Sequence, residues 1–231
     1  MFRCANAGKH VLLEKPVAPT LAEGKQIQAA FRQAGKKCFV CFYRRAMNRF
    51  MRLKQIIDDG EIGEITGVQI MRSAKALTDP AAWRADPGVC GGDVFTETDI
   101  HALDIMEMLM GPVHTFTYAK DRASATYSLS VKFVSGKVAG GVWNYNSQVE
   151  SDRFTILGTG GRIELDFFHN DQPLFIWNGN GCREEVITDS RHVGLNMEQA
   201  IVNELLGRGS FSGTLDNALE TLSIASGVYF G

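Results

Sequence analysis

The chain has 231 residues, of which 45% are hydrophobic and 10% aromatic, so it is long and apolar enough to bury a large core. Its 24 basic and 26 acidic side chains give a formal net charge of -2 and form no long run of one sign, which argues against a surface for nucleic acid or for an anionic membrane. No stretch approaches the roughly 18 consecutive apolar residues of a membrane span, and the segment MFRCANAGKH lacks the apolar centre of a signal peptide. The expected compartment is therefore the cytoplasm.

The N-terminal segment predicts a strand, a helix and a second strand. HVLLEK is typical of a buried strand that Pro16 ends, because proline has no N–H to donate. Thr20 begins a predicted helix over 20–35, with Glu23 three positions later and Gly35 at its end. CFVCFY follows as the second strand. Such a unit belongs to a doubly wound parallel sheet, but a buried parallel strand needs neighbours on both sides, and few residues precede this one.

The cysteines are odd in number and scattered, which favours reduced thiols over a disulfide framework. Cys38 and Cys41 form a C-x-x-C, but they lie in the predicted second strand, where residues three apart point to opposite faces. Structural thiols are therefore favoured over a metal or redox pair.

The remainder of the chain is predicted to be mostly β. A helix over 48–59 ends at Gly60, and further helices are predicted over 99–110, over 196–206 and from Thr214 to the end. Between them lie the predicted strand segments ITGVQIMRSAK, HTFTYAK, SLSVKFVSGKVAGGVWNYN, RFTILGTGGRIELDFF, PLFIWNGNG and EEVITD. Their short connections favour a large antiparallel or mixed sheet with one face covered. The change of pattern divides the chain into domains at 1–46 and 47–231.

Lys15 is the first candidate for chemistry. It stands at the carboxyl end of the predicted buried strand, the edge at which doubly wound sheets bind their ligands. A lysine there can polarise a hydroxyl or donate a hydrogen bond to a developing alkoxide. The alternative is a surface lysine that extends its charge to solvent. The following X-Pro bond can be cis, and such a bend would fix where the lysine points.

The second candidate is the block GGDVFTETDIHALDIMEMLMG, in which Thr96 or Thr98 is expected to cap a helix. Glu97 and His101 are four residues apart, which on an α-helix places them on one face with Cβ atoms about 5–6 Å apart. The carboxylate would fix the tautomer of the histidine and raise its pKa, leaving the other ring nitrogen to take a proton from substrate. The alternatives are a glutamate stabilised by the helix dipole and a core histidine with a backbone partner.

Several of these segments together resemble one family. AGKHVLLEKPVA, the strand ending FYRR, GEIGEITGVQ, the pair Trp83-Arg84, the block GG-x4-E-x3-H-x2-D and FTILGTGGRIEL are similar to the Gfo/Idh/MocA family of NAD(P)-dependent oxidoreductases, which includes inositol 2-dehydrogenase and glucose-fructose oxidoreductase. The resemblance implies an α/β remnant of a Rossmann doubly wound sheet at 1–46. It also implies an α+β substrate domain at 47–231 with a large, mostly antiparallel, open-faced sheet that often joins homo-oligomers.

The resemblance also implies roles for particular residues. Lys15 would polarise the substrate, His101 would act as general acid and base, and Glu97 would stand at the position of a family aspartate. The extra methylene of Glu97 moves its charge by about one bond length, where tolerance is near 1 Å. NAD or NADP would be contacted by Glu14, Lys15, Pro16 and Arg45. A sugar, inositol or related polyol would be contacted by Lys15, Trp83, Arg84 and His101. For Arg45, Trp83 and Arg84 the alternative is packing or a solvated charge.

The cofactor half of such a domain, with its G-x-G-x-x-G, has no counterpart in the sequence. Gly158-Thr159-Gly160-Gly161 comes nearest, but Ile163 replaces the third glycine and the segment is predicted to turn a hairpin instead of opening a helix. Binding of NAD(P) by this chain alone is therefore open. The alternatives are a truncated oxidoreductase, a non-catalytic dimerising or sugar-binding module, and a relative that cleaves glycosides or epimerises. The outer edge of the first strand is expected to pair with another chain.

Overall fold

The structure is a computed structural model that describes residues 1–76, 89 and 92–230. The chain forms two compact units: the first comprises Met1–Met47, Pro80–Ile105 and Arg191–Gly231, and the second comprises Asn48–Asp79 and Met106–Ser190. The chain passes from the first unit to the second after Met47, next to the predicted domain boundary at residue 46. Later segments of the chain return to the first unit, so each unit is built from segments that are not consecutive in the sequence.

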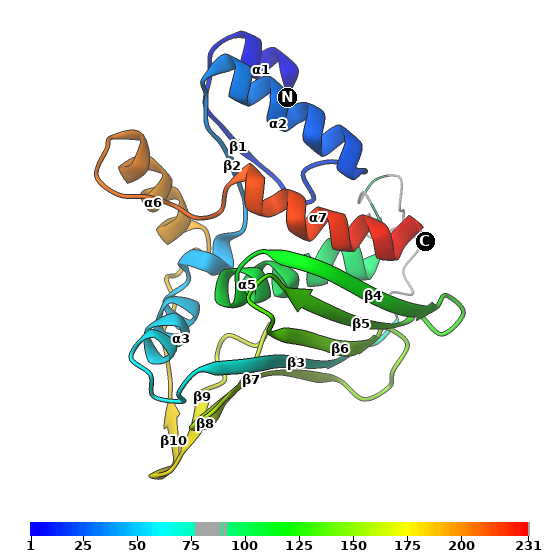
Figure 1. Ribbon diagram of the computed structural model, residues 1–231, viewed down its shortest axis with the longest axis vertical. Coiled ribbons are helices and arrows are strands. Elements are labelled where there is room, and N and C mark those ends of the chain that lie inside the picture. Colours follow the sequence, from blue (N-terminus) through cyan, green and yellow to red (C-terminus); the bar gives the residue numbers. More distant parts are fainter. Residues whose placement is uncertain (77–88, 90–91, 231) are drawn as a thin grey trace. The chain divides into compact units, whose positions relative to one another are not determined.

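The first unit contains the predicted strand-helix-strand segment. β1 (Val11–Leu13) and β2 (Cys38–Val40) pair in parallel, and α2 (Leu21–Ala34) connects them. Thr20 and Glu23 form a capping box at the start of α2, and Gly35 ends it in the left-handed region, as predicted. The other elements of this unit are α1 (Phe2–Asn6), η1 (Tyr43–Ala46), η3 (Phe95–Asp99), the first part of α5 (Ile100–Met110), α6 (Leu195–Leu205) and α7 (Leu215–Phe230). Within the unit, α2 lies beside α1 and α7 (Figure 1).

β1 differs from the prediction in its burial. Leu12 is 39% exposed, whereas a strand with neighbours on both sides would bury it. In the described part of the chain β1 pairs with β2 alone, so one edge of this two-stranded sheet has no strand beside it. The bond between Lys15 and Pro16 is cis. β2 is shorter than predicted, because the chain turns into the 3-10 helix η1 after Phe42.

The second unit is built on an eight-stranded sheet with the order β10-β9-β8-β7-β3-β6-β5-β4, which Figure 1 shows. Its elements are α3 (Asn48–Asp58), the end of α5, β3 (Ile65–Ser73), β4 (Val113–Asp121), β5 (Thr126–Phe133), β6 (Val138–Asn144), β7 (Ser151–Gly158), β8 (Gly161–Asp166), β9 (Leu174–Asn178) and β10 (Gly181–Glu185). Only β3 and β6 pair in parallel among these strands, so the sheet is mixed and mostly antiparallel, as predicted.

Two segments of this sheet test the predictions. Gly158 ends β7 and Gly161 begins β8 in an antiparallel pair, so the glycine-rich segment is a hairpin turn, as predicted. The strand predicted at EEVITD is wrong in position. β10 ends at Glu185 because that residue pairs with Leu174, the first residue of β9, and residues after it have no partner strand there.

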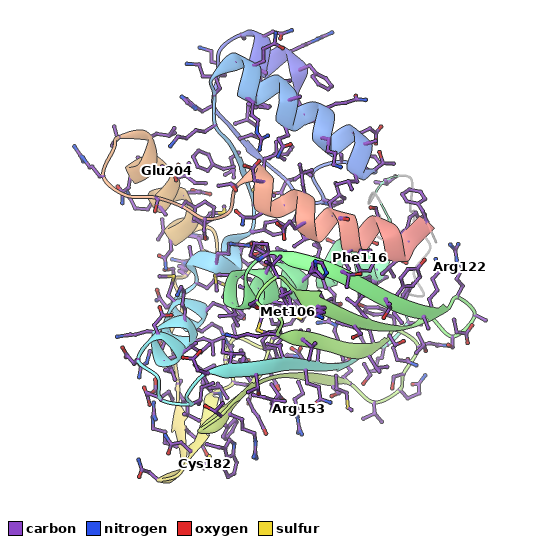
Figure 2. All side chains as sticks on the ribbon, viewed as in Figure 1. Met106, Phe116, Arg122, Arg153, Cys182 and Glu204 are labelled. Carbon is purple, nitrogen blue, oxygen red and sulfur yellow. The ribbon has the colours of Figure 1, made fainter. Side chains whose placement is uncertain are left out.

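The sheet has one buried face and one exposed face. Ile70, Trp143 and Phe154 are buried on the first, where Phe50 of α3 also packs against Phe167 with ring centroids 5.1 Å apart. We call the other side the open face and define it by Met71, Val142 and their neighbours in register. Met71 is 58% exposed and lies directly opposite Val142 of β6, which is 48% exposed. In β7, the other strand next to β3, the residue opposite Met71 is Arg153, which Figure 2 labels.

No helix in the described ranges is long and apolar enough to cross a membrane. Within the same residues, no group of histidine, cysteine and acidic side chains is arranged to hold a metal ion.

Candidate functional site

Lys15 lies at the carboxyl end of β1 and forms a buried ion pair. Its Nζ donates to Glu97 Oε1 at 2.8 Å and to the Glu97 main-chain oxygen at 2.5 Å, and the two side chains are 12% and 7% exposed. The surface alternative for Lys15 is therefore wrong. An ammonium has three N–H donors, and Glu97 takes two of them, so one remains for another acceptor.

Glu97 lies in η3 and holds Lys15 rather than His101. Its second carboxylate oxygen, Oε2, accepts from the Thr98 hydroxyl at 2.8 Å. η3 is a π-helix, but residues four apart lie near one face of a π-helix as they do on an α-helix, so the helix type does not separate Glu97 from His101. The predicted pairing is absent because both carboxylate oxygens of Glu97 have other partners, Lys15 and Thr98. The predicted cap is also wrong: Asp93 Oδ1 accepts from the Thr96 N–H at 2.9 Å at the start of this turn.

His101 is 4% exposed and packs against two aromatic rings. The centroid of its ring lies 4.9 Å from that of Tyr43 and 6.0 Å from that of Phe42, both in edge-on geometry. Nδ1 of His101 is buried and has no hydrogen-bond partner among the residues that the structure describes. The ring is therefore held by packing, and one of its nitrogens keeps its hydrogen-bonding capacity.

The surroundings of His101 lower its pKa well below the usual value. Burial is the largest cause, and the positive charges of Lys15 and Arg44 add to it. The predicted rise in the pKa of His101 is wrong. That rise was expected from a neighbouring Glu97 carboxylate, which is paired with Lys15 instead. A neutral imidazole at neutral pH is the form that can accept a proton.

We expect His101 to stay neutral in the folded chain when the pH falls below about 6.5, where an ordinary histidine takes up a proton. The unfolded chain then binds more protons at this position than the folded chain, so the contribution of His101 to stability, present above the unfolded pKa, is lost as the pH falls toward the folded pKa. Nitrogen-15 NMR of the imidazoles would measure this, with His101→Gln to assign the signal. A His101 signal that titrates near pH 6.5 would contradict the expectation.

Arg45 is buried in a second ion pair within the same unit. Its Nε donates to both carboxylate oxygens of Asp104 at 2.9 Å, and its Nη2 lies 2.8 Å from Oδ1. Nη1 reaches the main-chain oxygen and the hydroxyl of Ser212 at 3.5 and 3.4 Å. These contacts agree with the packing alternative for Arg45. Asp104 is the last residue of the GG-x4-E-x3-H-x2-D block, and its spacing from His101 could have indicated it.

The remaining predicted residues divide into two groups. Glu14 is exposed and Pro16 half-buried after β1, whereas Trp83 and Arg84 lie outside the described residues.

Burial raises the pKa of Cys38 to about 11, and burial together with Glu14 raises that of Cys41 to about 12. Both are therefore protonated at neutral pH, and neither supplies the thiolate that metal binding or redox exchange needs.

The site fits one end of a nicotinamide dinucleotide better than the other. The third N–H of Lys15 suits a reacting hydroxyl beside a nicotinamide, at the strand end where doubly wound sheets bind ligands, and the neutral His101 is near enough to be affected by the charge of Lys15. A pyrophosphate has no such fit. The N-terminus of α2 is occupied by its capping box, including the Glu23 carboxylate, and the glycine-rich segment is a hairpin turn.

Comparison with known proteins places these features in a family. The model of the GFO/IDH/MocA C-terminal domain matches residues 50–164, and that of the NAD-binding Rossmann fold of the same oxidoreductase family matches residues 1–42. An inositol 2-dehydrogenase of Rhizobium meliloti is 32% identical over 185 residues, which cover 78% of this chain and 51% of the relative. Oxidoreductase P35 of Formosa agariphila is 28% identical over 176 residues, covering 72% of this chain and 55% of the relative.

Solved structures agree on the fold. A levoglucosan dehydrogenase in complex with NADH and levoglucosan superposes with a TM-score of 0.84 at 19% identity, covering 98% of this chain and 72% of the other. The chain thus spans about half the length of the two curated relatives described above. Two matched domain models and the shared fold establish that the chain belongs to the Gfo/Idh/MocA family of oxidoreductases.

Proposed function

We propose that the chain acts in hydride transfer between NAD(P) and a hydroxyl of a sugar, inositol or related polyol. The observation that carries the proposal is the buried Lys15–Glu97 pair, with one ammonium N–H in reserve, in the same unit as a neutral histidine whose Nδ1 has no partner in the described part of the chain. A relative named as an inositol dehydrogenase and a neighbour holding levoglucosan support this substrate class.

Each residue of the site has a distinct part in the proposal. The third N–H of Lys15 would donate to the substrate oxygen and stabilise the negative charge that grows there. A ring nitrogen of the neutral His101 would accept the hydroxyl proton. Glu97 would hold the Lys15 side chain in place. Bound NAD(P)+ would supply the hydride acceptor, with Glu14 and Pro16 beside it.

The first test is calorimetric titration of the 231-residue chain with NAD(H) and with NADP(H). Micromolar binding of one pair, followed by its reduction in the presence of inositols or sugars, would support the proposal and give the cofactor preference. Absence of binding would mean that the chain alone is no dehydrogenase and would favour the second candidate, a dimerising or sugar-binding module.

The open face favours a homo-oligomer, whether the chain is an oxidoreductase or a dimerising or sugar-binding module. Met71 and Val142 place two exposed apolar side chains next to each other near the centre of a large sheet, where a second copy would bury them. We expect Met71→Glu to shift the chain from an oligomer to a monomer in sedimentation velocity, because the carboxylate would be desolvated in the interface. Val134→Glu is the matched control, since Val134 is 66% exposed but lies beyond the end of β5.

Two other outcomes of that experiment are informative. An oligomer that survives Met71→Glu would contradict the open face as the interface and leave the unpaired edge of β1 as the alternative. A monomeric parent chain would remove both.

A further inference from the structure

A pocket of about 260 Å³ opens in the first unit and shares no lining residue with the Lys15 site. We call it the basic pocket. It lies at the amino end of β2, whereas Lys15 follows the carboxyl end of β1, so the two sites are at opposite ends of the two-stranded parallel sheet. Its walls come from α2, from residues 36–39, from the end of α6, where Figure 2 labels Glu204, and from the start of α7.

The floor of the basic pocket is apolar, and its side chains are buried. Phe31 and Phe39 are each 2% exposed and Leu215 is 5% exposed, so these side chains belong to the core and reach the pocket only with their outer atoms. Phe39 also packs against Phe211, with ring centroids 6.4 Å apart. A ligand that fills this floor must therefore have an apolar body of its own.

The rim carries more positive than negative charge. Its two carboxylates already have partners: Asp216 accepts from Gln28 and Arg32, and Glu204 accepts from Lys37 and from the Phe211 N–H. Lys36, the third basic residue of the rim, is half-buried and has no ion pair in the described ranges. Three cations against two anions leave one positive charge that the protein itself does not neutralise.

The start of α7 does not offer a second group for an anion. The Thr214 hydroxyl accepts from the Asn217 N–H at 3.4 Å and donates to the Asn217 side chain, and Asp216 places a carboxylate in the first turn of the helix. Thr214 and Leu215 line the pocket at that turn, so Lys36 is the group that an anion in the pocket would meet.

We infer that the basic pocket binds a small organic monoanion with a flat apolar body, of the class of aromatic carboxylates. The apolar floor would hold the body, and Lys36 would pair with the carboxylate. The volume is slightly below the roughly 300–1,000 Å³ of pockets for drug-sized ligands, which restricts the ligand to one ring with short substituents.

The test uses the whole 231-residue chain and three probes: benzoate, benzamide and acetate. Amide chemical-shift mapping should place benzoate at residues 36–39 and at the start of α7. Benzamide, which has the ring without the charge, and acetate, which has the charge without the ring, should each bind at least about fivefold more weakly, because each lacks one half of the recognition.

Substitution separates the pocket from general surface charge. Lys36→Gln should weaken benzoate about tenfold by removing a charge-assisted hydrogen bond, and should leave benzamide unchanged. Lys25→Gln is the matched control, since Lys25 is an exposed lysine of α2 that does not line the pocket. Equal binding of acetate and benzoate, shifts that map elsewhere, or an equal effect of the two lysine variants would each overturn the inference.

Discussion

Replacing Arg45 with methionine is expected to lower the free energy of unfolding by about 3–5 kcal/mol, because it leaves the Asp104 carboxylate buried without its main cationic partner. The two side chains are 2% and 0% exposed, so water cannot compensate for the loss. A domain of ordinary stability has about 5–15 kcal/mol in total, so the variant should unfold at much lower urea concentration. Circular dichroism during urea unfolding measures the change.

An exposed pair of the same chemistry supplies the control. Arg32 lies 3.2 Å from Asp216, but these side chains are 66% and 63% exposed, and such pairs contribute only about 0–1 kcal/mol. Arg32→Met should therefore leave the unfolding curve nearly unchanged. The double variant Arg45→Met/Asp104→Leu should recover most of the stability, since it removes both buried charges. If Arg45→Met had as little effect as Arg32→Met, Arg45 would be available for a ligand, as the cofactor assignment requires.

The local elements were predictable where one rule governed them. α2 begins and ends as its capping box and Gly35 predict, because both signals act within one or two turns of the helix. The hairpin at Gly158 to Gly161 was predictable for the same reason, since two strand patterns flank it directly. The extent of β2 and the position of β10 were not, because a strand ends where its partner ends, and the partner is set by contacts distant in sequence.

The candidate site shows the same division. The sequence placed Lys15, Glu97 and His101 together through a family resemblance, and the structure brings Lys15 to Glu97 and buries His101 in the same unit. The four-residue spacing gave the wrong pair, because the Glu97 carboxylate is occupied by Lys15, which is 82 residues away in the sequence. A local spacing rule cannot find a partner so distant along the chain, so this pair could only come from the three-dimensional structure.

The ion pair of Lys15 gives the second large expected effect, on both stability and chemistry. Lys15→Met leaves the Glu97 carboxylate in a site that is 7% exposed, so we expect a loss of about 3–5 kcal/mol at neutral pH. Under the proposed function, the same variant removes the donor to the substrate oxygen and should lower kcat by about 100-fold or more. Lys25→Met, on an exposed face of α2, should change neither quantity.

The double variant Lys15→Met/Glu97→Gln separates the two effects. It removes the unpaired charge, so stability should return toward that of the parent while hydride transfer stays lost. His101 supplies a readout that needs no cofactor. Among the charged groups, Lys15 lowers the pKa of His101 most. The pKa of His101 should therefore rise in the double variant, and it should still stay below the usual value because the ring remains buried. If the imidazole titration in the folded double variant matched that of the parent chain, Lys15 would not act on His101, and the assignment of a shared site would fail.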